Sequence, residues 1–402
     1  MNVEPARALT EGEVEELRAG IPALRHSTYL NTAAVAPSHC TVTDTLVETY
    51  KWIGEHGYIT PDVHAQLLGR VREVRAQVAG FVGADPDEIV FLRNTTEGLN
   101  TIARGFTWQV GDEVILSNQE NPAALLPYAN LARRCGVTIR RLQLTDDASR
   151  VLSDLTSLLT PRTRLIVLSH VTHNTGLLLP FEEICSLGRR VGVPILWDGA
   201  QALGQVPVDF HQSGCDFYSG CSYKWLLGPF GAGILYIRRD WLKCLEVVDI
   251  GVGSQESLDL ETLDFTLKGT AQRHEYGSYP WPLYLGLGAA VRLLSGIGIR
   301  TIRRQILQLA DYAREGLATI PKVVVVSSAN PVHMSGILTI AVPRIDAQEV
   351  RRSLWEEYRV QTQFRHLPVG APAHQGIRFS LAVFTTRQEI DYALESLRKV
   401  LG

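Results

Sequence analysis

The 402-residue sequence lacks long hydrophobic runs and any strong excess of charge of either sign. No stretch approaches the roughly 18 consecutive apolar residues of a membrane-spanning helix. The formal net charge is only −3, and the basic stripe that is typical of nucleic-acid-binding proteins is missing. The opening segment, residues 1–20, is charged and lacks the apolar stretch of a signal peptide. We therefore expect no nucleic-acid partner, no membrane partner and a cytoplasmic location.

Cysteine is scarce and widely spaced. The six cysteines show no CxxC spacing, and none follows Cys244. Disulfide frameworks and zinc sites use cysteines in closely spaced, recognisable patterns. The spacing here predicts reduced thiols and no metal site, and it leaves residues 245–402 without a thiol.

The sequence does contain a regular alternation of short β-branched runs with longer amphipathic segments. Strands are predicted at 87–93, 112–117, 138–144, 163–171 and 193–198, with two more at DFYSG and GAGILYI. Strands that alternate with helices predict an α/β fold with a mostly parallel, helix-covered sheet. Ligands of such sheets bind beyond the carboxyl ends of the strands.

The pattern changes near Trp281. One or two long helices, the strands KVVVVS and GILTIAV, a helix, the strand GIRFSLAVF and a closing helix predict a smaller α+β domain. We expect an N-terminal segment, 1–28, that packs with this small domain. The large domain is then predicted at 29–280 and the small C-terminal domain at 281–402.

Three segments carry polar groups at predicted strand ends. RNTTEGLN (93–100) places Thr95 and Thr96 at a helix cap, where a phosphate can bind, although an ordinary cap has the same sequence. Asp198 ends a buried strand and needs a partner, so a structural ion pair is the alternative. Lys224 lies in the apolar SGCSYKWLLGPFGAGILY, where an amine can act as nucleophile or base. A phosphate cradle, an Asp and a Lys together suit pyridoxal phosphate.

With these segments the chain resembles the class V aminotransferase-fold enzymes, which include cysteine desulfurases, kynureninases and isopenicillin N epimerase. The resemblance runs from YLNTAAVAP (29–37) to IRFSLAVFTT (377–386) and is most specific in SHVTHNTG, WDGAQALGQVPVD and CSYKWLLGPFGAGILY. It implies fold type I of the pyridoxal-phosphate-dependent transferases. That fold has a large domain with a mostly parallel, seven-stranded sheet and a small α+β C-terminal domain.

The resemblance implies a role for each matching position around the cofactor. Lys224 would bind pyridoxal phosphate covalently, and Asp198 would pair with its pyridine nitrogen. Gln201 would hydrogen-bond its phenolic oxygen. Four residues would bind its phosphate through hydroxyl or backbone groups: Thr95, Thr96, Ser222 and Tyr223.

The resemblance also implies a substrate site and a dimer. Arg378 matches the arginine that pairs with the substrate carboxylate, a bidentate use of guanidinium. Asn31 and Ala33 would line the same substrate site. Gly277 and Ser278 match an element that reaches the phosphate of the neighbouring subunit. We therefore expect a small amino-acid substrate and a homodimer whose active site is shared across the interface.

Two departures from the family pattern bear on the reaction. Desulfurases carry a nucleophilic cysteine in the C-terminal third, whereas the corresponding VQTQFRHLPVGAPAHQG has none. Asn121 stands where a ring is expected to stack on the cofactor, and an amide is no acid or base near neutral pH. His173 is the candidate proton shuttle, and the resemblance implies that it and Asn174 face the cofactor. The alternative is a histidine that only hydrogen-bonds the phenolic oxygen or packs. Arg365 and His366 are further candidates for substrate contact.

Several reactions stay open at this point. Without an acceptor thiol, the sequence favours a β-eliminating carbon–sulfur lyase on an S-substituted cysteine, in bacterial specialised metabolism. An epimerase or aminotransferase of the isopenicillin N type is the alternative, supported by SYKWLLGP, and a decarboxylating or oxidative variant is a further one. A non-catalytic protein of the same fold is a third class, against which Lys224 and Asp198 argue.

Overall fold

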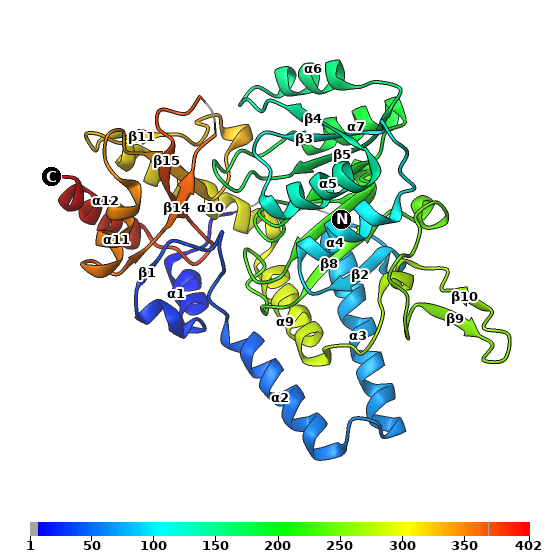
Figure 1. The fold of residues 1–402 in the computed structure, drawn as a ribbon. Helices are drawn as coiled ribbons and strands as arrows, with labels where there is room; N and C mark the ends of the chain where they lie inside the picture. Colours follow the sequence, from blue (N-terminus) through cyan, green and yellow to red (C-terminus); the bar gives the residue numbers. More distant parts are fainter. Residues whose placement is uncertain (1–6, 369) are drawn as a thin grey trace.

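A computed structural model describes residues 7–368 and 370–402. Its central sheet consists of β2 (Ile89–Leu92), β3 (Glu113–Ser117), β4 (Thr138–Leu142), β5 (Thr163–Ser169), β6 (Ile195–Asp198), β7 (Phe217–Cys221) and β8 (Gly233–Ile237). The strand order is β2-β8-β7-β6-β5-β3-β4 (Figure 1). Only β8 runs antiparallel to its two neighbours within this sheet, so the predicted α/β fold with a mostly parallel sheet is confirmed.

Helices cover both faces of this sheet because its strands are apolar on both sides. Along β3, Val114 and Leu116 face one core while Ile115 faces the other, as the two-residue period of a strand requires. The first core contains α4 (Thr95–Gly105) and α5 (Pro122–Cys135). The second is formed chiefly by residues of α3 (Pro61–Val82), α6 (Ala148–Leu158), α7 (Phe181–Val191), α8 (Phe210–Ser213) and α9 (Trp281–Ile297).

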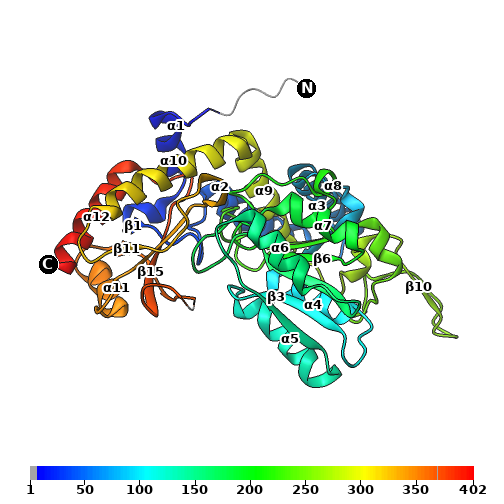
Figure 2. The ribbon, with the colours of Figure 1, turned by 90° about the horizontal axis from the view of Figure 1, so that it is seen from above.

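A second, smaller sheet forms the C-terminal part of the chain. It is antiparallel, in the order β11 (Val324–Val325), β12 (Ile337–Ala341), β15 (Gln375–Ser380) and β14 (Gln363–His366). Three helices pack with it around a separate core: α10 (Ile299–Ala318), α11 (Ala347–Glu356) and α12 (Arg387–Leu401). Figure 2 shows this α+β unit beside the large sheet, as the resemblance implied.

Among the described residues, the N-terminal segment contacts the C-terminal unit through Arg18 and residues 28–29, while Leu17 and Ile21 belong to the core beside the large sheet. α1 (Glu11–Ala19) carries Arg18, whose Nη1 lies 2.7 Å from Glu389 Oε2 at the start of α12. β1 (Thr28–Tyr29) pairs in parallel with β13 (Val360–Gln361). Residues 1–6 of the predicted segment 1–28 lie outside the described residues.

α9 lies on the large-sheet side, although the predicted boundary assigns it to the small domain. Trp281, Leu285, Leu287 and Leu294 join the core that contains α3. The chain then turns at Gly298, whose φ of +87° is accessible chiefly to glycine, and continues as α10. The predicted domain boundaries after residues 28 and 280 stay predictions.

Several elements had no counterpart in the sequence-based expectations. α2 (Cys40–His56) and α3 both pack against α9 below the sheet, and β9 (Gln255–Leu258) and β10 (Phe265–Leu267) form a projecting hairpin (Figure 1). The described residues also contain short 3-10 helices: η1 (Pro22–Arg25), η2 (Pro86–Glu88), η3 (Arg239–Lys243), η4 (Ala271–His274) and η5 (Pro331–His333). Within the described residues no single helix is long and apolar enough to cross a membrane; α9 and α10 meet that criterion only as a pair bent by 76°.

Candidate active site

A row of polar side chains lies at the carboxyl ends of three central strands. Ser169, Asp198 and Ser219 are direct cross-strand neighbours on β5, β6 and β7. Because residues in register on adjacent strands share a face, these side chains line the same level of the sheet. Ser219 Oγ donates a hydrogen bond to Thr95 O (3.0 Å), which attaches the start of α4 to this row.

The N-terminus of α4 is built for an anion, but the cap is one residue earlier than predicted. Asn94 is the N-cap, and its Oδ1 accepts from Glu97 N (3.0 Å). Thr95 and Thr96 therefore lie in the first helical turn, where backbone N–H groups have no intrahelical partner. Thr95 is buried and its Oγ1 has no hydrogen-bond partner in the described chain, whereas Thr96 is exposed. An orphaned buried hydroxyl beside free N–H groups fits a phosphate.

Asp198 is buried, and its hydrogen bonding only partly replaces the contacts with water that its carboxylate loses. Its Oδ1 accepts from Ala200 N (2.9 Å). Burial raises the pKa of Asp198, while the Ala200 hydrogen bond and the charge of Lys224 lower it. The Lys224 amine therefore lies near this carboxylate, and a protonated ring nitrogen is a partner that the carboxylate would accept.

The segment that carries Lys224 is attached to the N-terminal part of the chain through Gln201. Gln201 Nε2 donates to Ala33 O (2.9 Å), and its Oε1 accepts from Trp225 Nε1 (2.9 Å). A Cβ on Gly204 would lie 2.5–2.6 Å from the backbone of residues 225 and 226, so only glycine allows this close approach. Gln201 keeps one amide proton for the cofactor contact that the resemblance implies.

Ser222 and Tyr223 were expected beside the phosphate. Ser222 N donates to Ala232 O (3.0 Å), and Ser222 Oγ donates to Pro229 O (2.5 Å) and lies 2.9 Å from Ala232 O. Both donors are thus used inside the turn, and a phosphate contact would require the hydroxyl to rotate. Tyr223 is half-buried and packs against Phe230 at 4.5 Å between ring centroids. The phosphate contacts of both residues stay predictions.

Arg378 brings a buried cation to the same region. It is 0% exposed, and its Nη1 donates to His173 O (2.7 Å). Its Nε and Nη2 have no partner among the described residues. Burial and the nearby Arg365 lower the pKa of Arg378. A buried guanidinium with two free donors requires an anion.

His173 is neutral in this environment. Burial, together with the charges of Arg365, Arg378 and Lys224, lowers its pKa to about 3. Its Nδ1 is buried and lacks a hydrogen-bond partner within residues 7–368 and 370–402. A neutral imidazole with a free nitrogen can bind a polar ligand atom, but it carries no proton to spare near neutral pH.

Three predicted asparagines have different surroundings. Asn31 Nδ2 donates to Gln363 Oε1 (3.3 Å), and Asn31 Oδ1 is buried without a partner in the described structure. Asn121 Oδ1 caps α5 by accepting from Ala123 N (2.9 Å), so its side chain has a structural use. Asn174 is half-buried, and its backbone oxygen accepts from Thr339 Oγ1 (2.5 Å). Of these, Asn31 is the one with a buried side-chain atom that lacks a partner among the described residues.

Three further predicted residues lie apart from the ligand-facing groups. Gly277 and Ser278 are exposed, and Gly277 N donates to Val252 O (2.7 Å). Their implied contact with a neighbouring subunit stays a prediction. His366 is exposed and alternates to the face of β14 opposite Arg365, so it does not share the sheet face of Arg378.

Glu120 is a site residue that sequence reasoning missed. It is 4% exposed, and it accepts hydrogen bonds from Ser117 Oγ (2.5 Å), Ser169 N (3.1 Å) and Ser169 Oγ (2.5 Å). Burial, with a smaller contribution from the charge of Asp198, raises its pKa to about 7 against the opposing effect of these hydrogen bonds. The signal was a carboxylate directly before Asn121, at the end of a predicted strand.

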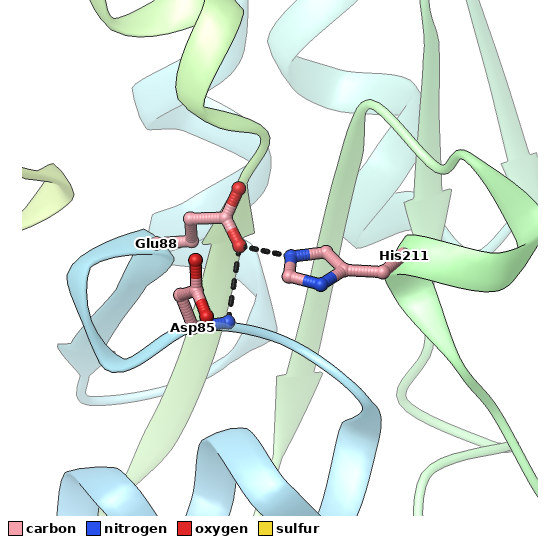
Figure 3. Close-up of side chains that lie close together, drawn as sticks. All are labelled: Asp85, Glu88 and His211. Atoms are coloured by element: carbon pink, nitrogen blue, oxygen red, sulfur yellow. Dashed lines mark hydrogen bonds and ion pairs between the residues drawn. The ribbon is translucent and has the colours of Figure 1, made fainter.

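A second cluster of titratable groups lies elsewhere, where no metal site was expected. The ligand atoms of Asp85, Glu88 and His211 lie within 4.8 Å of one another (Figure 3). Glu88 Oε2 accepts from Asp85 N (3.1 Å) and contacts His211 Nε2 (2.5 Å), and Glu88 Oε1 accepts from Arg239 N (3.0 Å). Both Glu88 oxygens are therefore engaged. Two ligands bonded at about 2 Å to one tetrahedral zinc lie farther apart than 2.5 Å.

Comparisons with known proteins find relatives that are similar in sequence and in fold. A cysteine desulfurase of Pectobacterium atrosepticum is 31% identical over 96% of this chain and 98% of its own. The structure of a cysteine desulfurase from Thermococcus onnurineus NA1 matches with a TM-score of 0.89 at 25% identity, covering 98% of this chain and 99% of that one. The cystine C-S lyase C-DES, in complex with its product cysteine persulfide, matches with a TM-score of 0.87 at 27% identity over 94% and 99% of the two chains.

The family assignment rests on most of the chain. The family model described as aminotransferase class-V matches residues 28–393. A C-DES variant with a TM-score of 0.87 and 27% identity, covering 95% of this chain and 98% of its own, has glycine covalently linked to its PLP cofactor. Lys224, Asp198 and the α4 N-terminus offer the groups that this cofactor needs. The chain therefore belongs to the class-V aminotransferase family and is a pyridoxal-phosphate-dependent enzyme.

Proposed function

We propose that this enzyme is a carbon–sulfur lyase that eliminates a thiol from an S-substituted cysteine. The observation that carries the proposal is the lack of a usable thiol at the site. The segment before Arg378 forms β14, a connection and β15, and it contains no cysteine. Cys221 is fully buried, and burial raises its pKa, so its thiol stays protonated. Elimination needs no acceptor thiol on the enzyme, whereas sulfur transfer from free cysteine does.

Bound pyridoxal phosphate supplies an electron sink for negative charge at the substrate Cα. Lys224 would hold it covalently, Asp198 would face its ring nitrogen, and the α4 N-terminus with Thr95 Oγ1 would hold its phosphate. The free Nε and Nη2 of Arg378 would bind the substrate carboxylate and thereby orient Cα toward Lys224.

The reaction balances without an added oxidant or reductant. The substrate's α-hydrogen leaves as a proton, which the Lys224 amine can accept when it is not bonded to the cofactor. The Cβ–S bond breaks and its electron pair stays on sulfur, which leaves as a thiolate and is protonated to the thiol. One water converts the remaining three-carbon unit to pyruvate and ammonia. His173 would act as a neutral hydrogen-bonding group, because its pKa of about 3 excludes an imidazolium at neutral pH.

The test is to incubate the purified holoenzyme with cysteine S-conjugates and to measure pyruvate and thiol. We expect both products in equal amounts, and little sulfide from free L-cysteine. Absence of both products would contradict the proposal. Deuterium entering the α-position without pyruvate would instead favour the epimerase alternative.

We also propose that the enzyme is a cytoplasmic homodimer. Large apolar side chains are exposed near the Gly277–Ser278 segment and on the β9–β10 hairpin, including Val252 (77%), Leu260 (79%) and Leu263 (70%). Such a surface suits burial against a second copy. All six cysteines are free, which suits a reducing compartment. Light scattering of the purified enzyme tests the dimer, and cell fractionation tests the cytoplasmic location.

A further inference from the structure

Arg365 is a second cation on the wall of the active site. On the β14–β15 pair, Gln363 lies opposite Arg378 and Arg365 lies opposite Gly376. Residues that alternate by two share one face of a sheet, so the side chains of Arg365 and Arg378 lie on the same face. The charge of Arg365 lowers the pKa values of both Arg378 and His173, so its guanidinium lies within electrostatic range of both.

Arg365 has no anionic partner among residues 7–368 and 370–402. Its Nε is buried without a hydrogen-bond partner, and no carboxylate of the described chain forms an ion pair with it. Desolvating a cation is costly unless an anion compensates for the lost water. Arg378 adds a second guanidinium, whose Nε and Nη2 have no partner in the described residues, whereas the charge of Lys224 is offset by the nearby Asp198 carboxylate. The surplus charge therefore indicates a ligand with more than one anionic group.

Arg378 alone can satisfy the amino-acid carboxylate. Its Nη1 is engaged by His173 O, so Nε and Nη2 remain. These two donors lie on one edge of the guanidinium and match both oxygens of a single carboxylate. Arg365 is thus left for a different anion.

We propose that Arg365 binds a second carboxylate, carried by the sulfur substituent of the substrate. This inference rests on the proposed elimination reaction and specifies its substrate class: cysteine S-conjugates whose leaving thiol carries a carboxylate. Arg365 is then a specificity-determining residue, because it touches the leaving group and not the bonds that break.

The experiment compares two substrates of the same size on the holoenzyme. S-(2-carboxyethyl)cysteine carries the second carboxylate, and S-(2-carbamoylethyl)cysteine replaces it with an amide. We expect wild type to prefer the acid, and Arg365→Gln to lower kcat/KM for the acid by about tenfold or more with little change for the amide, since one charge-assisted hydrogen bond is lost. Arg352→Gln, which removes an exposed charge on α11, serves as the matched control and should leave both values unchanged.

Calorimetric binding of the same two compounds separates this inference from the proposed reaction. If wild type converts neither compound but binds the acid more tightly in an Arg365-dependent way, the elimination is wrong and the role of Arg365 holds. Equal loss for acid and amide in Arg365→Gln would overturn the inference, because the arginine would then serve a shared contact or the fold. No loss for either compound would overturn it as well.

Discussion

The Lys224 site and the Asp85 cluster both gather charged side chains, yet they differ in how fully those side chains are paired. At the cluster, Glu88 is 3% exposed, but its two oxygens are bound by Asp85 N, His211 and Arg239 N. At the site, Thr95 Oγ1, His173 Nδ1 and two nitrogens of Arg378 are buried without partners among the described residues.

This difference separates a structural cluster from a binding site. A buried polar group without a partner costs free energy, on the order of 1–3 kcal/mol, so several such groups around one site point to a ligand that compensates for them. The cluster instead resembles a capping interaction, since Asp85 and Glu88 form a capping box at η2. Proximity of titratable residues is therefore weaker evidence of function than their unsatisfied donors and acceptors.

The largest expected effect comes from removing the amine. Lys224→Ala should lower the rate of elimination by about 10²–10⁴-fold or more, as expected when a catalytic base is lost. It should also remove the visible absorption of covalently bound cofactor. Lys51→Ala, at an exposed position of α2, is the control and should change neither. Retained absorption in Lys224→Ala would show that another residue anchors the cofactor.

Glu120 tests a case between the two regions, because it is buried like the site but hydrogen-bonded like the cluster. Its pKa rises from 4.5 in the unfolded chain to about 7 in the native protein. Between these values the native carboxyl keeps its proton while the unfolded one loses it, so this group's stabilising contribution is lost as pH rises from about 4.5 to 7.

Glu120→Gln removes that titration. Relative to wild type, the variant's free energy of unfolding should increase between pH 4.5 and 7, by on the order of 3 kcal/mol. Urea unfolding at several pH values measures this difference. A difference that stays constant across this range would show that the native carboxyl titrates normally.

The two threonines of α4 test whether orphaned hydroxyls mark the binding site. Thr95→Val removes the buried, unpartnered Oγ1 and should raise the dissociation constant of pyridoxal phosphate by about tenfold, the loss of one charge-assisted hydrogen bond. Thr96→Val, at the exposed neighbour, should change it far less. Fluorescence titration of the cofactor-free protein gives the dissociation constant of each variant. Equal increases for Thr95→Val and Thr96→Val would show that the unpartnered hydroxyl does not mark the binding site.

The smallest effect is expected at the Asp85 cluster. Adding zinc or a chelator should shift the melting temperature by less than about 1 °C, because bound ligands stabilise only where a site exists. A saturable rise in melting temperature with zinc that disappears in His211→Gln would contradict the distinction between the cluster and the Lys224 site. The cluster would then be a metal site. Thermal unfolding followed by circular dichroism decides between these outcomes.

Much of the fold was predictable because its signals are local. Each predicted strand of the large sheet exists within a few residues. The strongest local signals were the buried runs that end at Asp198 and surround Lys224. By contrast, the sequence did not predict that α9 would pack on the large-sheet core, since its apolar residues suit burial against either domain.

The residues of the site were predictable from the sequence, but which of their polar atoms lack a hydrogen-bond partner was not. Asn94, one residue before the predicted cap, is the residue whose side chain caps α4. Ser222 has its donors engaged by Pro229 O and Ala232 O, a pairing that depends on the turn. Glu120 gains its burial from β5, which follows it by about 50 residues in the chain.

The sequence by itself determined the family, the cofactor and the missing acceptor thiol, because these depend on which residues stand at which positions. The tertiary structure decided which donors remain free and that Arg365 joins Arg378 on one face of the small sheet. The reason is physical: hydrogen-bond pairing and burial depend on partners far away in the chain, and the β14–β15 register exists only in the folded protein.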